Sequence, residues 1–445
     1  MRGGVSLSAP QRSSLTLALV AGVLFVVGVV VLIPWSALPP GSADPHAIFS
    51  ATQLHTLRAY ASEQRPLAWT SYFLIVALSL VLAVVPVIRR SFLRLPGRLV
   101  VQVLLATAIV SVVSQVLTLP FDWIYFQNAR RAGVSVESTG LWWRDLVVGA
   151  VIGWVPLALA AVITVLVVRR FQRSWPLVLG AVAGIAVVIG SLIFPVVVEP
   201  LFTSTHPLPA GPLRTAVFEL AAREGVHLHD VVVADASTRT TAENAEVTGF
   251  GPTERLVLDD TLLRSMTQRE VEVVVGHELG HAANHDVLTG TMLGALGAMA
   301  AIGVVGVVIT RRRNLSSLTT ASAVPILFAL FTVGTFIISP LENSMSRAIE
   351  SRADRAALAA THDRAAFVAV QKQLDLAARL DPTPPAWSQF WWGSHPTVLE
   401  RISLAGGKSD GWPGDSSGHP SASDQARMRA MPIRISSCCL RSRWC

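Results

Sequence analysis

Seven long apolar stretches, none of which contains a charged residue, limit most strongly how this chain can fold. A helix needs about 20 apolar residues to cross the hydrocarbon core of a bilayer, because backbone hydrogen bonds cannot be left unmade in lipid. The stretches cover residues 15–33, 71–88, 99–119, 146–168, 177–198, 287–309 and 321–339. They predict a mainly α, polytopic membrane protein of about seven transmembrane helices.

Composition and charge support a lipid bilayer as the surroundings of the chain. Only 15% of the 445 residues are charged, against about 25% in soluble proteins. The net charge of +7 comes largely from arginines at the ends of the apolar stretches, not from a basic patch laced with aromatic residues. This pattern excludes nucleic acid as a partner. All three cysteines lie in the last eight residues, so no disulfide holds the body of the chain together.

The first apolar stretch has two interpretations. Arg2 and Arg12 precede it, as basic residues precede a cleaved secretory signal. Its 19 residues exceed a usual signal core, however, and six further stretches follow. We therefore expect it to be retained as a membrane anchor.

The order of apolar and polar segments predicts a soluble domain that is split by a helical hairpin. Five spans come first, and two polar segments then flank the last two spans. The tail is rich in Ser, Gly, Asp and Arg and cannot bury enough apolar surface to fold, so we expect it to be disordered. The predicted divisions are the membrane domain 1–198, the first polar half 199–286, the hairpin 287–339, the second polar half 340–405 and the tail 406–445.

Local patterns in the polar halves predict a small β-sheet and several helices. Thr267 and Glu270 form a capping-box pattern at the start of a helix. Leu213, Val217 and Leu220 have the spacing of a short amphipathic helix. The remaining predicted elements are strands at 230–234 and 256–258 and helices at 344–360 and 365–380.

The sequence His277-Glu278-Leu-Gly-His281 falls on the helix that Thr267 caps. Residues four apart differ by about 40° around a helix, so His277 and His281 project from one face and can hold one Zn²⁺ ion. Glu278 lies about 100° away, where it can act as a general base on water without ligating the metal. The alternative is a surface helix with freely titrating histidines. The apolar residues 273–275 and the adjoining span favour a buried metal site, and hence a split zincin-like metalloprotease domain.

A third metal ligand has to come from another helix. Glu350 meets this need just beyond the hairpin, and Asp354 falls one turn later on the same face. Asp354 is placed to accept the free ring N–H of a ligating histidine and so to fix its tautomer. The alternative is an exposed helix with ordinary ion pairs, such as Glu350 with Arg347.

His285 competes for the role of third ligand. It follows His281 by four residues and would share the ligand face of one straight helix. It would then stand about 12 Å along the axis from His277, which strains a shared metal site. We expect His285 to support a ligand or to face solvent.

Together these residues resemble the type I CAAX prenyl endopeptidases, seven-span integral-membrane zinc metalloproteases. The resemblance covers most of the chain. The matching segments are residues 200–202, 207–209, 244–245, 248–250, 255–263, 277–281, 346–354, 395–396 and 401, with echoes at 133 and 143–145. It implies one Zn²⁺ per chain on His277, His281 and Glu350, Glu278 as general base, and Asp354 as the residue that orients a ligand.

The resemblance also implies how substrate is held. Asn244 and Ala245 would lie on an edge strand that pairs with an extended peptide. His395 and Arg401 would contact substrate or the developing oxyanion, which makes His395 a catalytic residue; the alternative for His395 is an ordinary loop histidine before proline.

Two residues depart from the family pattern near that strand. Glu246 stands where an aromatic is usual, and Asp259 where an apolar residue is usual. Both add negative charge near the strand that would bind substrate, so the resemblance alone does not predict a prenylated substrate.

We therefore expect a membrane-embedded zinc metalloendopeptidase that hydrolyses peptides or membrane proteins by metal-activated water. The alternative from another class is a catalytically idle, zinc-bound membrane scaffold, which would have no need of Glu278. Within the enzyme class, a dedicated CAAX-type protease and a quality-control protease for damaged membrane proteins both remain open.

The sidedness of the active site is predicted from arginines near the span ends, which stay in the cytoplasm. Twelve arginines flank the N-terminus and the second, fourth and sixth connections, and five flank the first and third. This bias predicts a multi-pass protein of the cell membrane with an extracytoplasmic active-site domain. Resemblance to the eukaryotic members implies a cytosolic one instead.

Overall fold

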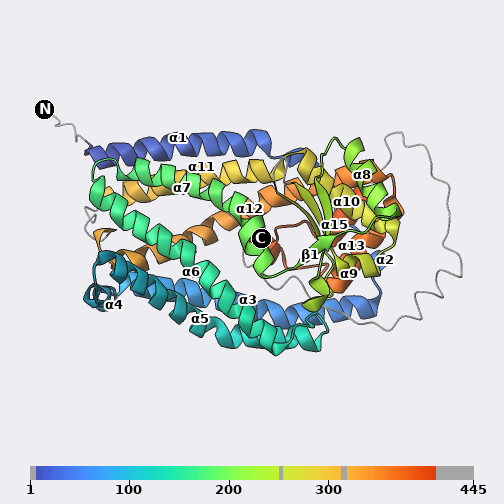
Figure 1. The fold of residues 1–445 in the computed structure, drawn as a ribbon, viewed down its shortest axis with the longest axis horizontal. Coiled ribbons are helices and arrows are strands. Elements are labelled where there is room, and N and C mark those ends of the chain that lie inside the picture. The colour runs from blue at the N-terminus through green and yellow to red at the C-terminus, as the bar shows by residue number, and fades with distance from the viewer. Residues whose placement is uncertain (1–6, 250–253, 312–317, 407–445) are drawn as a thin grey trace, which may run out of the picture.

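The chain forms a bundle of long helices with a small α+β part at one end (Figure 1). The structure is a computed structural model that describes residues 7–249, 254–311 and 318–406. Seven of its helices are long and apolar enough to cross a membrane, which confirms the predicted architecture. The predicted disordered tail lies, apart from Gly406, outside the described residues.

The seven spans pack both with sequence neighbours and with spans distant in the sequence. Helix α11 lies between α1 and α7, while α3 packs against both α5 and α12. A side chain at Gly303 of α11 would collide with the backbone of Ala18, so glycine is what allows α1 and α11 to approach closely. The spans are α1 (Ala9–Leu32), α3 (Ala51–Val84), α5 (Leu99–Arg131), α6 (Thr139–Arg170), α7 (Trp175–Ile193), α11 (Asp286–Arg311) and α12 (Ala323–Thr361). Short helices α2 (Pro45–Ile48) and α4 (Pro86–Ser91) lie between them.

A four-stranded sheet organises the polar end of the molecule. Its strand order is β1-β2-β4-β3, with β2 parallel to β4 and the two outer pairs antiparallel. The strands are β1 (Thr205–Pro207), β2 (Asp230–Ala234), β3 (Ala245–Thr248) and β4 (Arg255–Asp259). The two predicted strands, β2 and β4, form the buried centre, and β1 and β3 are short edges.

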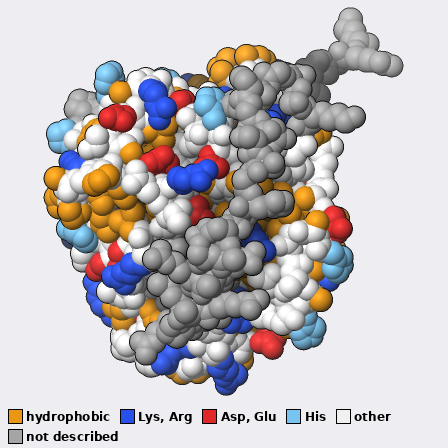
Figure 2. Space-filling view, turned by 90° about the vertical axis from the view of Figure 1, so that its right-hand side faces the viewer, with side chains coloured by type: hydrophobic (Ala, Val, Ile, Leu, Met, Phe, Trp, Pro, Cys, Tyr) orange, Lys and Arg blue, Asp and Glu red, His pale blue; other side chains and the backbone are white. Residues whose placement is uncertain are grey.

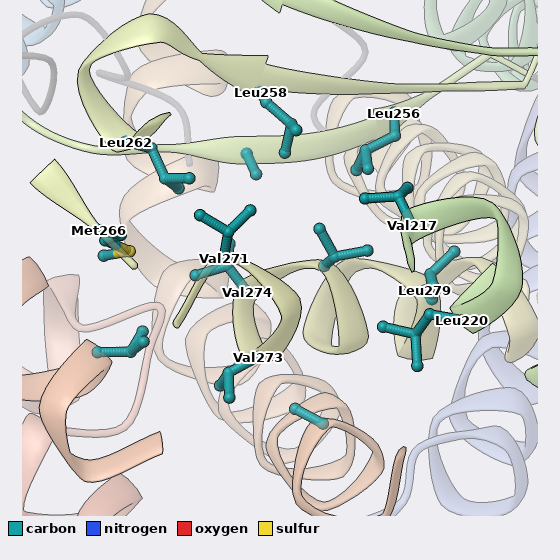
Figure 3. Close-up of a cluster of buried hydrophobic side chains, with 14 of the residues drawn as sticks. Val217, Leu220, Leu256, Leu258, Leu262, Met266, Val271, Val273, Val274 and Leu279 are labelled. Atoms are coloured by element: carbon teal, nitrogen blue, oxygen red, sulfur yellow. The ribbon is translucent and has the colours of Figure 1, made fainter. Parts of the chain in front are cut away.

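Helices cover one face of this sheet and form the main core. Leu256 and Leu258 of β4 point toward Val217 and Leu220 of α8 and toward Leu279 of α10 (Figure 3). The helices of this end are α8 (Pro212–Arg223), α9 (Asp260–Ser265), α10 (Gln268–Ala283), α13 (Arg364–Ala378), α14 (Ala386–Trp392) and α15 (Val398–Ala405). Charged and apolar side chains mix over the outer surface of this end (Figure 2), unlike the uncharged spans.

Two of the joins between the polar end and the bundle, α10–α11 and α12, differ from each other. Helix α10 begins at the predicted Thr267–Glu270 capping box and ends at Ala283. His285 then adopts the left-handed conformation, with φ of 53°, before α11 starts. The expectation that His285 continues the ligand face of a straight helix is therefore wrong, because the helix has already ended. His285 is exposed, as one of its two interpretations had it.

At the other join, the seventh span and the helix predicted at 344–360 are one continuous helix, α12. Pro340 lies inside it and cannot donate a hydrogen bond to the carbonyl of Phe336. The hydroxyl of Ser339 donates to that carbonyl instead, at 3.0 Å. Because the freed acceptor is satisfied locally, the two elements that were predicted separately continue as one helix.

Candidate active site

Two helices bring three ligand atoms together. His277 and His281 lie on α10, and Glu350 lies on α12. The Nε2 atoms of the two histidines are 3.2 Å apart. The Glu350 carboxylate lies 3.2 Å from Nε2 of His277 and 3.5 Å from Nε2 of His281. The three ligand atoms all lie within 4.8 Å of one another. This is the set that the sequence predicted.

Small residues let the two helices approach closely enough for this arrangement. A Cβ on Gly280 of α10 would lie 2.8 Å from the Cβ of Ala356 on α12, and a Cβ on Gly276 would lie 3.3 Å from the Cα of Ala357. Both distances are shorter than ordinary contacts. The glycines on either side of Glu278 thus set the spacing of the ligand cluster.

The far side of His277 is held by a buried ion pair. Its Nδ1 lies 3.0 Å from Asp354, whose side chain is fully buried. Arg401 of α15 donates two hydrogen bonds to the same carboxylate, at 2.5 and 2.8 Å. Asp354 therefore occupies the predicted position behind a ligand, and it leaves Nε2 of His277 facing Glu350.

His281 has an equivalent support that the sequence did not reveal. Its Nδ1 lies 3.0 Å from Asp286, and Asp286 forms an ion pair with Arg352 of α12. The turn at His285 folds Asp286 back toward α10. The only sequence signal was a lone acidic residue at the start of a span, which has no helical spacing to either histidine.

The electrostatics of the cluster suit a cation. Burial lowers the pKa of His277, but its contacts with Asp354 and Glu350 outweigh this and raise the pKa to about 10. Imidazole nitrogen and carboxylate oxygen are the donors that Zn²⁺ prefers, and each Nδ1 already has an acceptor. The residues present therefore fit a metal ion held through both Nε2 atoms and Glu350.

Glu278 lies beside the cluster and contacts the sheet. Burial raises the pKa of its carboxyl group, while His277 and His281 oppose the rise. The backbone N–H of Val247 on β3 donates a hydrogen bond to it. Glu278 is thus positioned between the candidate metal ligands and the edge of the sheet.

The free edge of β3 faces this position. Asp259 N–H donates to the carbonyl of Asn244 at 3.0 Å. Because paired and unpaired residues alternate along an antiparallel edge, the backbone groups of Ala245 and Val247 point away from the sheet. The Val247–Glu278 hydrogen bond agrees with this direction. Asn244 directly precedes the strand.

A cavity of about 110 Å³ joins the predicted site residues. Its lining includes Asn244, Ala245, Glu278, His395 and Arg401. Nε2 of His395, whose side chain is 54% exposed, lies 3.5 Å from Glu350. Arg401 lies behind His277, with its guanidinium committed to Asp354.

The two departures from the family pattern lie close to each other on the sheet. Asp259 is only 8% exposed, and its pKa is raised to about 8, first by burial and then by the negative charge of Glu246. Burial also raises the pKa of Glu246, to about 7.

Comparison with known families covers both halves of the chain. Residues 207–407 match the model of peptidase family M48. Residues 43–204 match the CAAX prenyl protease N-terminal model, which describes five membrane helices.

Individual relatives agree with these matches. An uncharacterized metalloprotease, YhfN, of Bacillus subtilis is 28% identical over 67% of this chain and 71% of its own. A CAAX prenyl protease 1 homolog of Arabidopsis thaliana is 30% identical over 66% of this chain and 71% of its own. The crystal structure of S. mikatae Ste24p has the same fold, with a TM-score of 0.72 at 20% identity, covering 88% of this chain and 99% of that one. The chain therefore belongs to peptidase family M48, in the membrane-bound branch of the CAAX prenyl proteases.

Proposed function

We propose that this protein is a zinc metalloendopeptidase that cleaves peptides or membrane proteins. The observation that carries the proposal is the convergence of His277, His281 and Glu350 beside Glu278 and an open strand edge. A metal held for structure alone has no need of an unligated, buried carboxyl group next to it. Membership of a metalloprotease family supports the same conclusion.

His277, His281 and Glu350 would hold the metal. Zn²⁺ bound there supplies a Lewis acid that lowers the pKa of a water molecule to about 7. Asp354 and Asp286 hold the two imidazoles in the orientation that this requires. Ion pairs with Arg401 and Arg352 fix the two carboxylates in place.

The other site residues bind the peptide and act in the hydrolysis. The free backbone edge at Ala245 pairs with an extended substrate by strand addition, and Asn244 contacts the same peptide. Glu278 takes a proton from the attacking water and delivers it to the leaving amine. His395 donates from Nε2 to the developing oxyanion. Arg401 contributes to substrate binding through its position in the cavity wall.

Glu278→Gln tests the chemistry. The variant should lose at least about a hundredfold in kcat, because general-base catalysis typically contributes that much, while its zinc content stays at wild-type level. Glu272→Gln, six residues earlier on α10, is a matched control that should keep full activity. Unchanged cleavage by Glu278→Gln would refute the general-base role. Stoichiometric zinc with no hydrolysis of any peptide by the wild-type protein would favour the idle scaffold.

Natural substrates can be found by comparing membrane proteomes of cells that carry the active enzyme or Glu278→Gln. Several relatives are named CAAX prenyl proteases, so uncut prenylated C-termini would indicate a dedicated protease of that kind. Accumulation of damaged membrane proteins would indicate quality control.

We also propose that the active-site end faces outward from the cell membrane, on the arginine bias. The three native cysteines would be replaced by serine, and single cysteines introduced by Glu219→Cys on α8 and Arg94→Cys at the opposite end. An impermeant thiol reagent applied to intact cells should label the first and spare the second. Labelling of Arg94→Cys alone would place the active site in the cytosol.

A further inference from the structure

The segment that leads into the edge strand is held by the membrane half of the protein. It runs from a short 3-10 helix, Ala236–Thr238, to Ala245. Arg239 donates from Nε to Asp145 of α6 at 3.1 Å. The next residue, Thr240, forms an isolated antiparallel bridge with Ser135 of the α5–α6 connection. The amide of Val136 donates to the carbonyl of Arg239 at 3.2 Å.

Asp145 is a fixed and buried anchor for this contact. Its side chain has no exposed surface, and it also pairs with Arg144 at 2.7 Å. Arg144 in turn donates to the carbonyl of Leu201 at 3.0 Å. On the preceding turn Trp142 stacks on Phe126 of α5, with ring centroids 5.1 Å apart. The corner between α5 and α6 is therefore packed rigidly on both sides of Asp145.

The opposite side of the segment is held by the catalytic half. The hydroxyl of Thr261 donates to the carbonyl of Ala242 at 2.6 Å. The backbone amide of Ser237 donates to Asp260 at 2.8 Å. Two parts of the protein thus clamp one segment, and three residues after Ala242 the free edge of β3 begins.

Edge strands are held on one side only, so their position depends on the residues that lead into them. Removal of the Asp145 charge would leave Arg239 without its buried partner, which is costly for a charged group. The resulting shift would fall on Asn244 and Ala245, which are the first groups to meet an extended peptide. The ligands on α10 and α12 are held by separate contacts and would not move.

We propose that Asp145 is a positioning residue for substrate: through Arg239 it fixes the start of the β3 edge, so that the enzyme favours long, extended peptides. The inference rests on the proposed endopeptidase function. It gives the membrane half a part in substrate recognition that is distinct from anchoring. Asp145 touches neither substrate nor metal.

The test uses the full-length, zinc-loaded protein and two fluorogenic peptides with the same scissile bond, one of four residues and one of about ten. Asp145→Asn should raise KM for the long peptide by about tenfold, equivalent to one or two lost backbone hydrogen bonds. Its kcat, its zinc content and its kcat/KM for the short peptide should stay within about twofold of wild type, since the chemistry is untouched. Arg239→Ala should behave likewise, and Arg239→Lys should restore part of the affinity.

Arg214→Ala is the matched control, because Arg214 ties α8 to Asp230 at 2.8 Å on the far side of the sheet. It removes an ion pair that lies outside the segment leading into β3, and it should leave the ratio of kcat/KM for the long and short peptides unchanged. Equal losses for both peptides in Asp145→Asn, or the same length-dependent loss in Arg214→Ala, would overturn the proposal.

Binding separates this inference from the proposed function. Calorimetry with Glu278→Gln protein and the uncleaved long peptide should show about tenfold weaker binding when Asp145→Asn is added. This result holds whether or not any peptide is cut. Equal affinities would refute the positioning role, whereas absence of cleavage by the wild-type protein would refute only the endopeptidase function.

Discussion

Two joins between the catalytic end and the membrane bundle, α12 and α10–α11, place a carboxylate behind a histidine in opposite ways. At one, α12 runs unbroken from the bilayer to Glu350 and Asp354. At the other, the chain breaks at His285 between α10 and α11. Each join places one carboxylate beside the Nδ1 atom of a histidine of the proposed metal site, Asp354 from the unbroken helix and Asp286 from the broken one.

The difference shows two ways in which a join can position side chains in this site. A continuous helix fixes residues four apart on one face, so ligand and supporting carboxylate come as a pair. A break in the helix ends this regular spacing. It allows the next residue to fold back to a position that no straight helix could give it. The two kinds of join together surround the metal position on both sides.

The largest effect should follow removal of the ligand on the unbroken helix. Glu350→Ala takes away one of three ligand groups, and we expect the purified protein to lose its zinc. The loss should exceed the roughly 10 to 100-fold weakening caused by loss of an orienting residue. Metal analysis after gel filtration measures it, and Glu350→Asp, with a shorter side chain, should retain part of the metal. A metal-filled Glu350→Ala protein would break the assignment.

Removal of the two supporting carboxylates should weaken zinc binding at both joins but reduce stability to different extents. Asp354→Ala and Asp286→Ala should each keep zinc, with affinity about 10 to 100-fold lower. Asp354→Ala should also cost about 3 to 5 kcal/mol of stability, because Arg401 is left buried without its partner. Asp286→Ala should cost less, since the side chain of Arg352 is 27% exposed against 13% for Arg401.

Competition with a chelator measures zinc affinity, and thermal unfolding measures stability. Asp354→Asn and Asp286→Asn are size-matched controls that remove charge only. Equal stability losses at both positions would show that the two joins are energetically alike, contrary to the comparison.

The smallest effect should be seen at the break itself. His285→Ala removes an exposed imidazole and should leave zinc affinity within about twofold, because His285 contributes no ligand. Its left-handed backbone favours residues without a Cβ, so His285→Gly should match or exceed wild-type stability while His285→Ala falls slightly below it. Zinc content and melting temperature report both. An empty site in His285→Ala, with zinc retained in Glu350→Ala, would reverse the assignment of the third ligand.

The features that could be predicted from the sequence are those that depend on regular helices, and the features that could not be predicted depend on local departures from them. Uncharged runs determine the spans, and helical spacing places His277, His281, Glu350 and Asp354, because these depend on local periodicity. The place of Asp286 depends on one left-handed residue, which histidine does not signal. The sequence predicted the span at 321–339 and the helix at 344–360 as separate elements; the structure joins them across Pro340, where the hydroxyl of Ser339 satisfies the freed carbonyl. The edge strand β3 is only four residues long, and the resemblance indicated it where periodicity did not.

The unbroken α12 also has a mechanical meaning. Glu350 lies 22 residues along this helix from Phe328, about 33 Å at helical rise, so each degree of tilt about that point moves Glu350 by about half an ångström. Packing against neighbouring helices sets the tilt of a spanning helix, and α12 packs against α3 in the bundle. Because α12 is one continuous helix, a change in its packing within the bundle would be transmitted along its length to Glu350 in the candidate site.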